Sequence, residues 1–343
     1  MTPSLTQMRR EVLEIPDAVD RLLQNGSDDI CRAADAARIR APNYMVSVAR
    51  GSSDHVATYL KYASELLIGT PAASIGPSIA SIYKRQLNLK GSVCLSVSQS
   101  GKSPDIVEMA EMARIGGALS ITMTNNIDSP LAQVADHILN LHAGPEHSVA
   151  ATKSFVNSCV AGIWLLAEWG EDNALLAAIH DLPDMLEQAV KTDWPEFRET
   201  LVGRNSILCL GRGPAYAISN EAALKFKETC QIYAESYSSA EVLHGPVSIV
   251  DAGFPVIAFA AQDEAEPTLA SVADEMAAMG AKVYATSAKV HHATALSAIR
   301  SGHALTDPIA LIASFYTMVE RVAVSRGINP DSPRHLNKVT ETI

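Results

Sequence analysis

The chain's most informative polar run is SQSGKSPD at residues 98–105, which lies between an apolar run and an amphipathic stretch. Such a run opens a helix, and the free backbone N–H groups of a first helical turn bind phosphate well. Gly101 lets the backbone approach a ligand closely, and Pro104 suits the first turn. These N–H groups and three hydroxyls predict a site for a phosphate monoester. The alternative is an ordinary capped helix, because Ser-x-x-Asp is also a common cap.

A second hydroxyl-bearing loop, Arg50-Gly51-Ser52-Ser53, follows an earlier apolar run. The carboxyl ends of parallel strands meet at one edge of a sheet, and ligands bind at that edge. We therefore expect this loop to lie on the same edge as residues 98–105.

Two carboxylates surround one ammonium in the helix predicted over residues 220–233. Glu221, Lys225 and Glu228 are spaced i, i+4 and i+7, so they share one helix face. Such a set can tune a proton-transfer group, and this face begins where ligands bind. The alternative is a solvated ladder of ion pairs, worth roughly 0.3 kcal/mol per pair.

Two further residues could take part in a reaction. His244 lies in the turn-like segment EVLHGP, and a loop histidine can transfer protons near neutral pH, although most are simply exposed to solvent. Lys338 lies in a polar stretch with two prolines, which normally indicates a frayed tail. Its amine could attack a sugar carbonyl if the tail covers a pocket.

Composition excludes several classes of function. The net charge of −11 disfavours non-specific nucleic-acid binding, which needs clustered Lys and Arg. The five cysteines show neither a disulfide framework nor zinc spacing, and the histidines form no ligand cluster, so we assign no metal and no cofactor. Because we find neither a signal-peptide pattern nor a membrane-spanning apolar run, we expect a cytoplasmic protein without a membrane partner.

Apolar runs followed by glycine or polar turns alternate with helical patterns along the chain. Strands are predicted within residues 44–54, 92–101, 118–124, 137–141, 206–216, 255–261 and 281–287. Helices are predicted within residues 8–23 (two, divided at Pro16), up to Leu67, up to Ile115, and over 149–169, 220–233 and 307–327. The pattern of the first half returns in the second. It predicts an α/β protein with two copies of a parallel sheet flanked by helices.

A length of 343 residues suggests about two domains. We expect an N-terminal helical segment (1–33), a first domain (34–172), a helical linker (173–200), a second domain (201–328) and a C-terminal tail over the active site (329–343).

Six motifs occur in order along nearly the whole chain: RGSSD, SQSGKSPD, EHSVAATKSF, EAALKFKE, EVLHGP and SPRHLNKV. Together they resemble the isomerase half of glucosamine-6-phosphate synthase. They are more similar still to the stand-alone glucosamine-6-phosphate deaminases, which are built on the same two sugar-isomerase (SIS) domains.

The resemblance implies roles for the residues in these motifs. Those implied to bind the phosphate or line the sugar site are Ser53, Ser98, Gln99, Ser100, Ser103 and Val149. Glu228 is implied to move the proton between C1 and C2, while Lys225 and Glu221 position it. His244 is implied to open the sugar ring and to come from the neighbouring subunit of a homodimer. Lys338 is implied to form an imine with the open-chain ketose.

Departures from the synthase pattern favour a deaminase. The chain starts with Met1-Thr2-Pro3, and we expect no glutaminase domain that would release ammonia from glutamine. Lys102 stands where synthases have an acidic residue. The second half has no counterpart of SQSG, so we expect one substrate site per subunit. The expected reaction converts glucosamine-6-phosphate to fructose-6-phosphate and ammonia.

Two alternatives remain open. The substrate could instead be galactosamine-6-phosphate or a fructosamine-6-phosphate, since pocket details decide between them. SIS domains also serve as sugar-phosphate sensors, because fold alone never fixes function. A sensor, however, has no use for the proton-transfer set of Glu228, His244 and Lys338.

Overall fold

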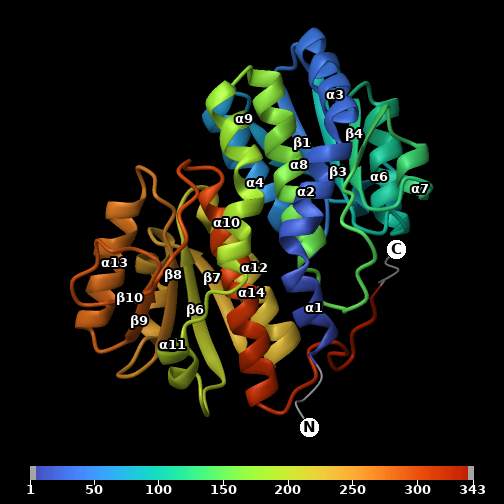
Figure 1. Ribbon diagram of the computed structural model, residues 1–343. Coiled ribbons are helices and arrows are strands. Elements are labelled where there is room, and N and C mark those ends of the chain that lie inside the picture. Colours follow the sequence, from blue (N-terminus) through green and yellow to red (C-terminus); the bar gives the residue numbers. More distant parts are fainter. Residues whose placement is uncertain (1–4, 339–343) are drawn as a thin grey trace. The chain divides into compact units, whose positions relative to one another are not determined.

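The computed structural model describes residues 5–338 and contains two five-stranded sheets (Figure 1). The strand orders are β2-β1-β3-β4-β5 and β10-β9-β8-β6-β7. Every pair of neighbouring strands is parallel. The predicted α/β architecture with a duplicated parallel sheet is therefore confirmed.

The described residues form two compact units. The first-sheet unit comprises residues 17–146, 153–180 and 337–338. Its strands are β1 (Tyr44–Val48), β2 (Ala72–Ser74), β3 (Ser92–Val97), β4 (Leu119–Thr124) and β5 (His137–Asn140). Its helices are α2 (Ile15–Asn25, which begins just before the unit), α3 (Ser27–Arg40), α4 (Ser52–Leu67), α5 (Ser78–Ser81), α6 (Pro104–Ile115), α7 (Pro130–Gln133), α8 (Lys153–Gly170) and α9 (Asn173–His180).

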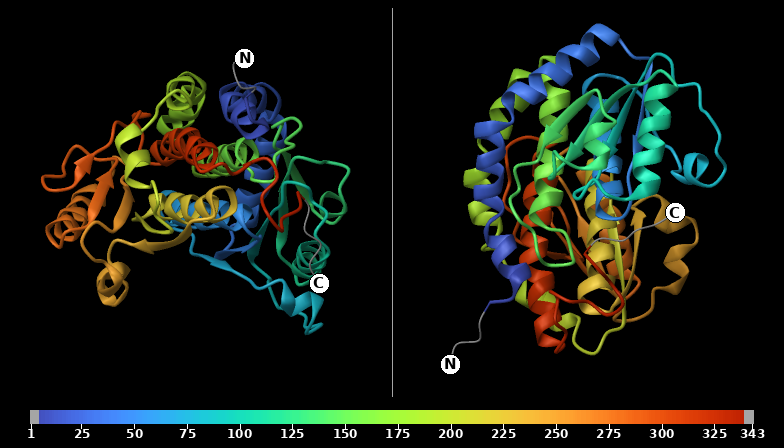
Figure 2. Two further views of the ribbon diagram at one scale, coloured as in Figure 1. Left: turned by 90° about the horizontal axis from the view of Figure 1, so that it is seen from below. Right: turned by 90° about the vertical axis from the view of Figure 1, so that its right-hand side faces the viewer.

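The second-sheet unit comprises residues 5–16, 147–152 and 181–336. Its strands are β6 (Ser206–Gly211), β7 (Tyr233–Ser238), β8 (Pro255–Phe259), β9 (Lys282–Ala285) and β10 (Thr294–Ala295). Its helices are α1 (Gln7–Leu13), α10 (Leu182–Ala189), α11 (Pro195–Thr200), α12 (Pro214–Cys230), α13 (Glu266–Ala278) and α14 (Asp307–Ser325), with 3-10 turns η1 (Glu241–His244) and η2 (Pro246–Ile249). Helix α1 packs against α14 (Figure 2).

The duplication extends to backbone conformation. Gly51 follows β1 with φ 56° and ψ −133°, and Gly213 follows β6 with φ 56° and ψ −138°. Only glycine adopts this conformation without strain, so both strand-to-helix turns need it. The turn then starts a helix over the sheet edge in each unit, α4 in one and α12 in the other.

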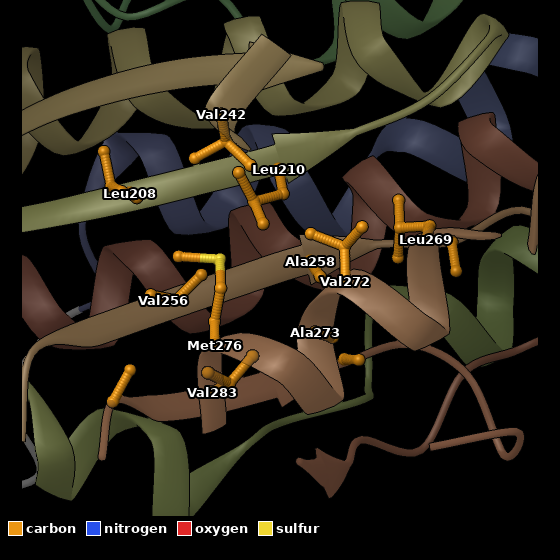
Figure 3. Packing of buried hydrophobic residues seen from close by; sticks show 13 residues of the cluster. Leu208, Leu210, Val242, Val256, Ala258, Leu269, Val272, Ala273, Met276 and Val283 are labelled. Atoms are coloured by element: carbon orange, nitrogen blue, oxygen red, sulfur yellow. The ribbon is translucent and has the colours of Figure 1, made fainter. Parts of the chain in front are cut away.

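The core of the second-sheet unit lies between β6, β8 and α13. Val256 and Met276 are fully buried, and their side chains point toward each other (Figure 3). The central strands β3 and β8 are buried along their whole length, as expected where helices cover both faces of a parallel sheet.

Two predicted helices have wrong boundaries. The helix predicted over residues 220–233 instead spans Pro214–Cys230, and it ends there because Gln231 is left-handed with φ 53° and the chain then forms the edge strand β7. Its sequence, YAESYS, is too polar to resemble the buried strands. The helix predicted from Val149 begins only at Lys153.

One helix among residues 5–338, α14, is long and apolar enough to cross a membrane, and 83% of its apolar window is buried in the protein. Such burial is typical of a core helix. The expectations that concern Met1-Thr2-Pro3 and residues 339–343 of the tail lie outside the described residues.

Candidate functional site

The loop at residues 98–103 connects β3 to α6 in the first-sheet unit. The Ser98 hydroxyl oxygen accepts a hydrogen bond from the Gly101 N–H at 3.2 Å, which closes the loop on itself. Gly101 has φ +63°, and a Cβ at this position would lie 2.1 Å from the Ser129 hydroxyl oxygen. Only glycine therefore fits, and the loop is folded tightly around it.

The segment after β4 holds the same loop from outside. The Gln99 carbonyl accepts the Asn125 N–H at 3.1 Å, and the Gly101 carbonyl accepts the Leu131 N–H at 3.1 Å. Backbone carbonyls thus face the protein. The side chains of Gln99 and Ser100 are partly exposed at the end of the strand.

Ser103 is the N-cap residue of α6, but its side chain makes no cap hydrogen bond. Pro104 is the first residue of the helix, as predicted. The capped-helix alternative therefore does not describe this turn. The partly exposed Ser103 side chain is not used as a cap at the helix N-terminus, where an anion is stabilised.

An ion pair joins this helix start to the neighbouring loop at 50–53. Asp105 is fully buried and accepts from Arg50 Nε at 2.7 Å and Nη2 at 2.6 Å. Ser53, in the first turn of α4, is partly exposed. The predicted shared sheet edge is confirmed for these two loops, but the ion pair that joins them was not predicted from the sequence.

The carboxylate–lysine set lies on α12 in the second-sheet unit. The Lys225 and Glu221 side chains have no exposed area, whereas 21% of the Glu228 side chain is exposed. Lys225 Nζ lies 3.1 Å from a Glu221 oxygen and 2.7 Å from a Glu228 oxygen. The solvated-ladder alternative is therefore wrong, because the ammonium is completely buried.

Opposing effects act on the Lys225 ammonium. Burial lowers its pKa, but the carboxylates of Glu221 and Glu228 and their hydrogen bonds raise it, and the net shift of the pKa is upward. The lysine is therefore charged at neutral pH. Glu221 is fixed further by the Tyr316 hydroxyl of α14, which donates to it at 3.0 Å. Glu228 is the carboxylate of this set that reaches the surface.

His244 ends the turn η1, which follows β7, and its side chain is exposed. The next residue, Gly245, has φ +144°. The segment predicted to be a loop is therefore a short 3-10 turn, and the His244 side chain is accessible to solvent in the single chain.

Val149 lies in the segment between β5 and α8, and its N–H donates to the Asp331 carbonyl at 3.5 Å. Lys338 Nζ lies 3.0 Å from a carboxylate oxygen of Glu146. Glu146 is itself buried and accepts from the Ser154 hydroxyl at 2.6 Å. The described part of the tail thus makes specific contacts, so the frayed-tail alternative is wrong for it.

Glu146 was not predicted from the sequence as a site residue, although it is the first residue of the motif EHSVAATKSF. The first-sheet unit contains the predicted residues Ser53, Ser98, Gln99, Ser100, Ser103 and Lys338. The second-sheet unit contains Val149, Glu221, Lys225, Glu228 and His244.

The equivalent edge of the second sheet is occupied by carboxylates. After β8, buried Glu266 binds the Ser287 hydroxyl at 2.7 Å and Lys289 Nζ at 2.7 Å. Buried Asp307 pairs with Arg300 and accepts the Gln262 N–H at 2.8 Å. Both carboxylates are thus paired with basic side chains, and the described segment that follows β8 has no counterpart of the SQSG loop. Within residues 5–338, no group of three or more His, Cys, Asp or Glu side chains could hold a metal ion.

The chain belongs to the SIS-domain family, whose model matches residues 39–168 and 200–325. Two glutamine–fructose-6-phosphate aminotransferases (isomerizing) are similar to it. The one from Sulfurisphaera tokodaii is 30% identical over 96% of this chain and 56% of its own length. The one from Symbiobacterium thermophilum is 33% identical over 88% of this chain and 52% of its own length. The chain thus spans about half the length of these curated relatives.

Solved structures extend the comparison. A candidate phosphosugar isomerase from Silicibacter pomeroyi DSS-3 is 59% identical with a TM-score of 0.93, covering 95% of this chain and 100% of that one. The C-terminal domain of glucosamine-fructose-6-phosphate aminotransferase from Francisella tularensis is 25% identical with a TM-score of 0.85, covering 96% and 98%. A glucosamine-6-phosphate deaminase from Thermotoga maritima is 20% identical with a TM-score of 0.76, covering 98% and 100%, which shows a shared fold.

Proposed function

We propose that the chain is a sugar-phosphate isomerase that deaminates glucosamine-6-phosphate to fructose-6-phosphate and ammonia. The observation that carries this proposal is the buried Lys225 between two carboxylates, of which Glu228 reaches the surface. A partly exposed carboxylate whose position is fixed by a buried ammonium is suited to act as a general base. The relatives named for isomerising fructose-6-phosphate chemistry support the same class.

In the proposed reaction, His244 opens the sugar ring by proton transfer. Glu228 then takes the proton from C2 of the open-chain aldose and returns it to C1, which converts the 2-amino aldose to the ketose imine. Water adds to that imine at C2, and ammonia leaves. Lys225 holds Glu228 in place through their ion pair at 2.7 Å, while Glu221 and its Tyr316 partner fix Lys225. Each step is a proton transfer or an addition that side chains can assist.

Lys338 would act on the ketose. Its amine attacks C2, water leaves, and an imine of fructose-6-phosphate forms. The tail lysine must be released from Glu146 for this step. The hydroxyls of Ser98, Ser100 and Ser103, with the N-terminus of α6, would hold the phosphate during the reaction.

We extend the proposal to the domain boundaries and to the oligomeric state. We place the first SIS domain, which contains the proposed phosphate loop, at residues 34–172, and the second, which contains the proton-transfer set, at residues 201–328. We propose that His244 serves the site of a second copy in a cytoplasmic homodimer. Its exposure on η1, next to exposed Leu243, supports this placement.

Ammonia release tests the proposal. Purified protein is given glucosamine-6-phosphate, galactosamine-6-phosphate or a fructosamine-6-phosphate, and ammonia is measured with glutamate dehydrogenase. We expect release from glucosamine-6-phosphate with an equal amount of fructose-6-phosphate. Release from another of the three would change the substrate but keep the mechanism. Binding without release from any of them would favour a sensor.

A further inference from the structure

A buried carboxylate of the N-terminal helix holds the segment that contains Val149. Glu11, on α1, is 1% exposed. Its carboxylate accepts hydrogen bonds from the His147 N–H, the Ser148 N–H and the Ser148 hydroxyl. All these residues belong to the second-sheet unit.

Asp331 holds the same helix and the same segment from the C-terminal side. Its two carboxylate oxygens accept the N–H groups of Gln7 and Met8 at 2.7 Å each, at the first turn of α1. Its carbonyl accepts the Val149 N–H at 3.5 Å. Helix α1, residues 147–149 and the C-terminal segment therefore form one closed set of contacts.

These contacts determine the conformation of residues 147–149, which belong to no helix or strand. A buried carboxylate is costly unless hydrogen bonds satisfy it, and here backbone N–H groups of that segment are among its donors. Such hydrogen bonds to backbone N–H groups hold the segment's backbone in one conformation. Glu146, which binds Lys338, immediately precedes the segment in the chain.

We propose that Glu11 is a positioning residue that sets the backbone of residues 147–149 for the sugar, with Asp331 fixing the helix that carries it. The proposal rests on the proposed function, in which Val149 lines the sugar site. Glu11 itself touches no substrate in this account. It acts on the sugar end of the ligand and leaves the phosphate loop at 98–103 unchanged.

The test compares Glu11→Gln with the parent in two binding measurements and in turnover. The variant should bind glucosamine-6-phosphate about tenfold more weakly by calorimetry and show a similar rise in KM, since one charged hydrogen-bond acceptor is lost. Its Kd for inorganic phosphate should be unchanged. Glu187→Gln is the matched control, because Glu187 is exposed on α10 and pairs only loosely with Lys191 at 3.8 Å.

A role in folding alone predicts a different pattern. The unfolding midpoint of Glu11→Gln would fall, while the folded variant would keep the parent's KM and Kd for the sugar phosphate, and this result would overturn the proposal. Equal weakening of sugar-phosphate and phosphate binding would overturn it too. If Glu11→Gln does not fold, Ser148→Ala carries the test, with the same direction expected and the same outcomes overturning it.

The same measurements test the proposed function independently of the role of Glu11. If the parent binds glucosamine-6-phosphate but never turns it over, the deaminase proposal fails and the Kd comparison still decides the role of Glu11. If the parent binds the sugar phosphate no more tightly than inorganic phosphate, both proposals are rejected.

Discussion

At the scale of single residues, burial separates two carboxylates that look alike in sequence. Glu221 and Glu228 both pair with Lys225. Glu221 is fully buried and accepts a hydrogen bond from Tyr316, whereas Glu228 is partly exposed. The i, i+4, i+7 spacing predicted the shared face. Spacing alone could not predict that the face is buried, because burial depends on α14, whose sequence lies about ninety residues further along the chain.

Replacing Glu228 with Gln removes the proposed base but keeps its shape. We expect kcat with glucosamine-6-phosphate to fall by roughly 10²–10⁴-fold, since that is what a positioned general base contributes. Binding of inorganic phosphate, measured by calorimetry, should be unaffected. Glu187→Gln is the control, and turnover by Glu228→Gln at the parent's rate would reject the role.

The raised pKa of Lys225 makes part of the stability depend on pH. A raised pKa means that this stabilisation is complete below the ordinary lysine pKa of 10.5 and is lost as the pH rises through the higher pKa of the folded protein. At pH 7, Lys225→Met should lower the free energy of unfolding by about 3–5 kcal/mol, because two carboxylates lose their counter-charge.

Chemical denaturation at pH 7 and at a series of values above 10.5 checks the sign. The difference between parent and Lys225→Met should shrink as the pH rises. A difference that stays constant or grows over this range would show that the ion pairs do not stabilise the fold.

The tail lysine can be tested by trapping. Borohydride reduces an imine between Lys338 and fructose-6-phosphate to a stable amine, so the parent protein should gain the mass of the reduced sugar phosphate. Lys338→Ala should gain none, and Lys191→Ala, which changes an exposed lysine, should be labelled like the parent. If Lys338→Ala gains the same mass as the parent, Lys338 does not form the imine.

At the scale of elements, strand–glycine–helix units were predictable and irregular ones were not. The helices ending at Leu67 and Ile115 were placed correctly, because each follows a buried strand and a turn with strong local signals. β7 was missed because an edge strand buries little and its sequence is polar. Residues 149–152 were assigned to a helix because they are mostly apolar. The Val149 N–H is instead bound by the Asp331 carbonyl, and Glu11 binds the two residues that precede Val149.

The phosphate loop depends on its glycine. In Gly101→Ala, a Cβ would lie 2.1 Å from the Ser129 hydroxyl oxygen at φ +63°, so the loop must open. We expect Gly101→Ala to bind phosphate at least about tenfold more weakly than the parent. Backbone strain should in addition lower its free energy of unfolding by roughly 1–2 kcal/mol.

Gly203→Ala provides the control for strain. Gly203 also has a positive φ, +73°, but a Cβ there meets no described atom within 4 Å. This variant should lose similar backbone stability and keep phosphate affinity, as measured by calorimetry. Unchanged phosphate affinity in Gly101→Ala would remove residues 98–103 from the site.

At the scale of the whole molecule, the duplication is clear in topology but unequal in chemistry. Both units repeat the Arg-Gly turn, yet one sheet edge has a hydroxyl-rich loop and the other has buried Glu266 and Asp307. Sequence pattern predicted the duplication and the missing second loop. It could not predict that the two ends of the chain meet at α1, because such contacts join residues more than 300 positions apart.

This inequality predicts the stoichiometry of binding. Calorimetric titration with glucosamine-6-phosphate should give one molecule per chain, because the segment after β8 has no counterpart of the SQSG loop. Ser103→Ala should weaken that single event. Two equivalent binding events per chain would contradict the assignment of a single phosphate loop.

The central claim, that this SIS protein deaminates glucosamine-6-phosphate, is tested most directly by following that compound with the purified protein by NMR. Fructose-6-phosphate and ammonium should appear together in equal amounts, and Glu228→Gln should form both roughly 10²–10⁴-fold more slowly. A sugar phosphate that binds and stays unchanged in the parent protein would contradict the account.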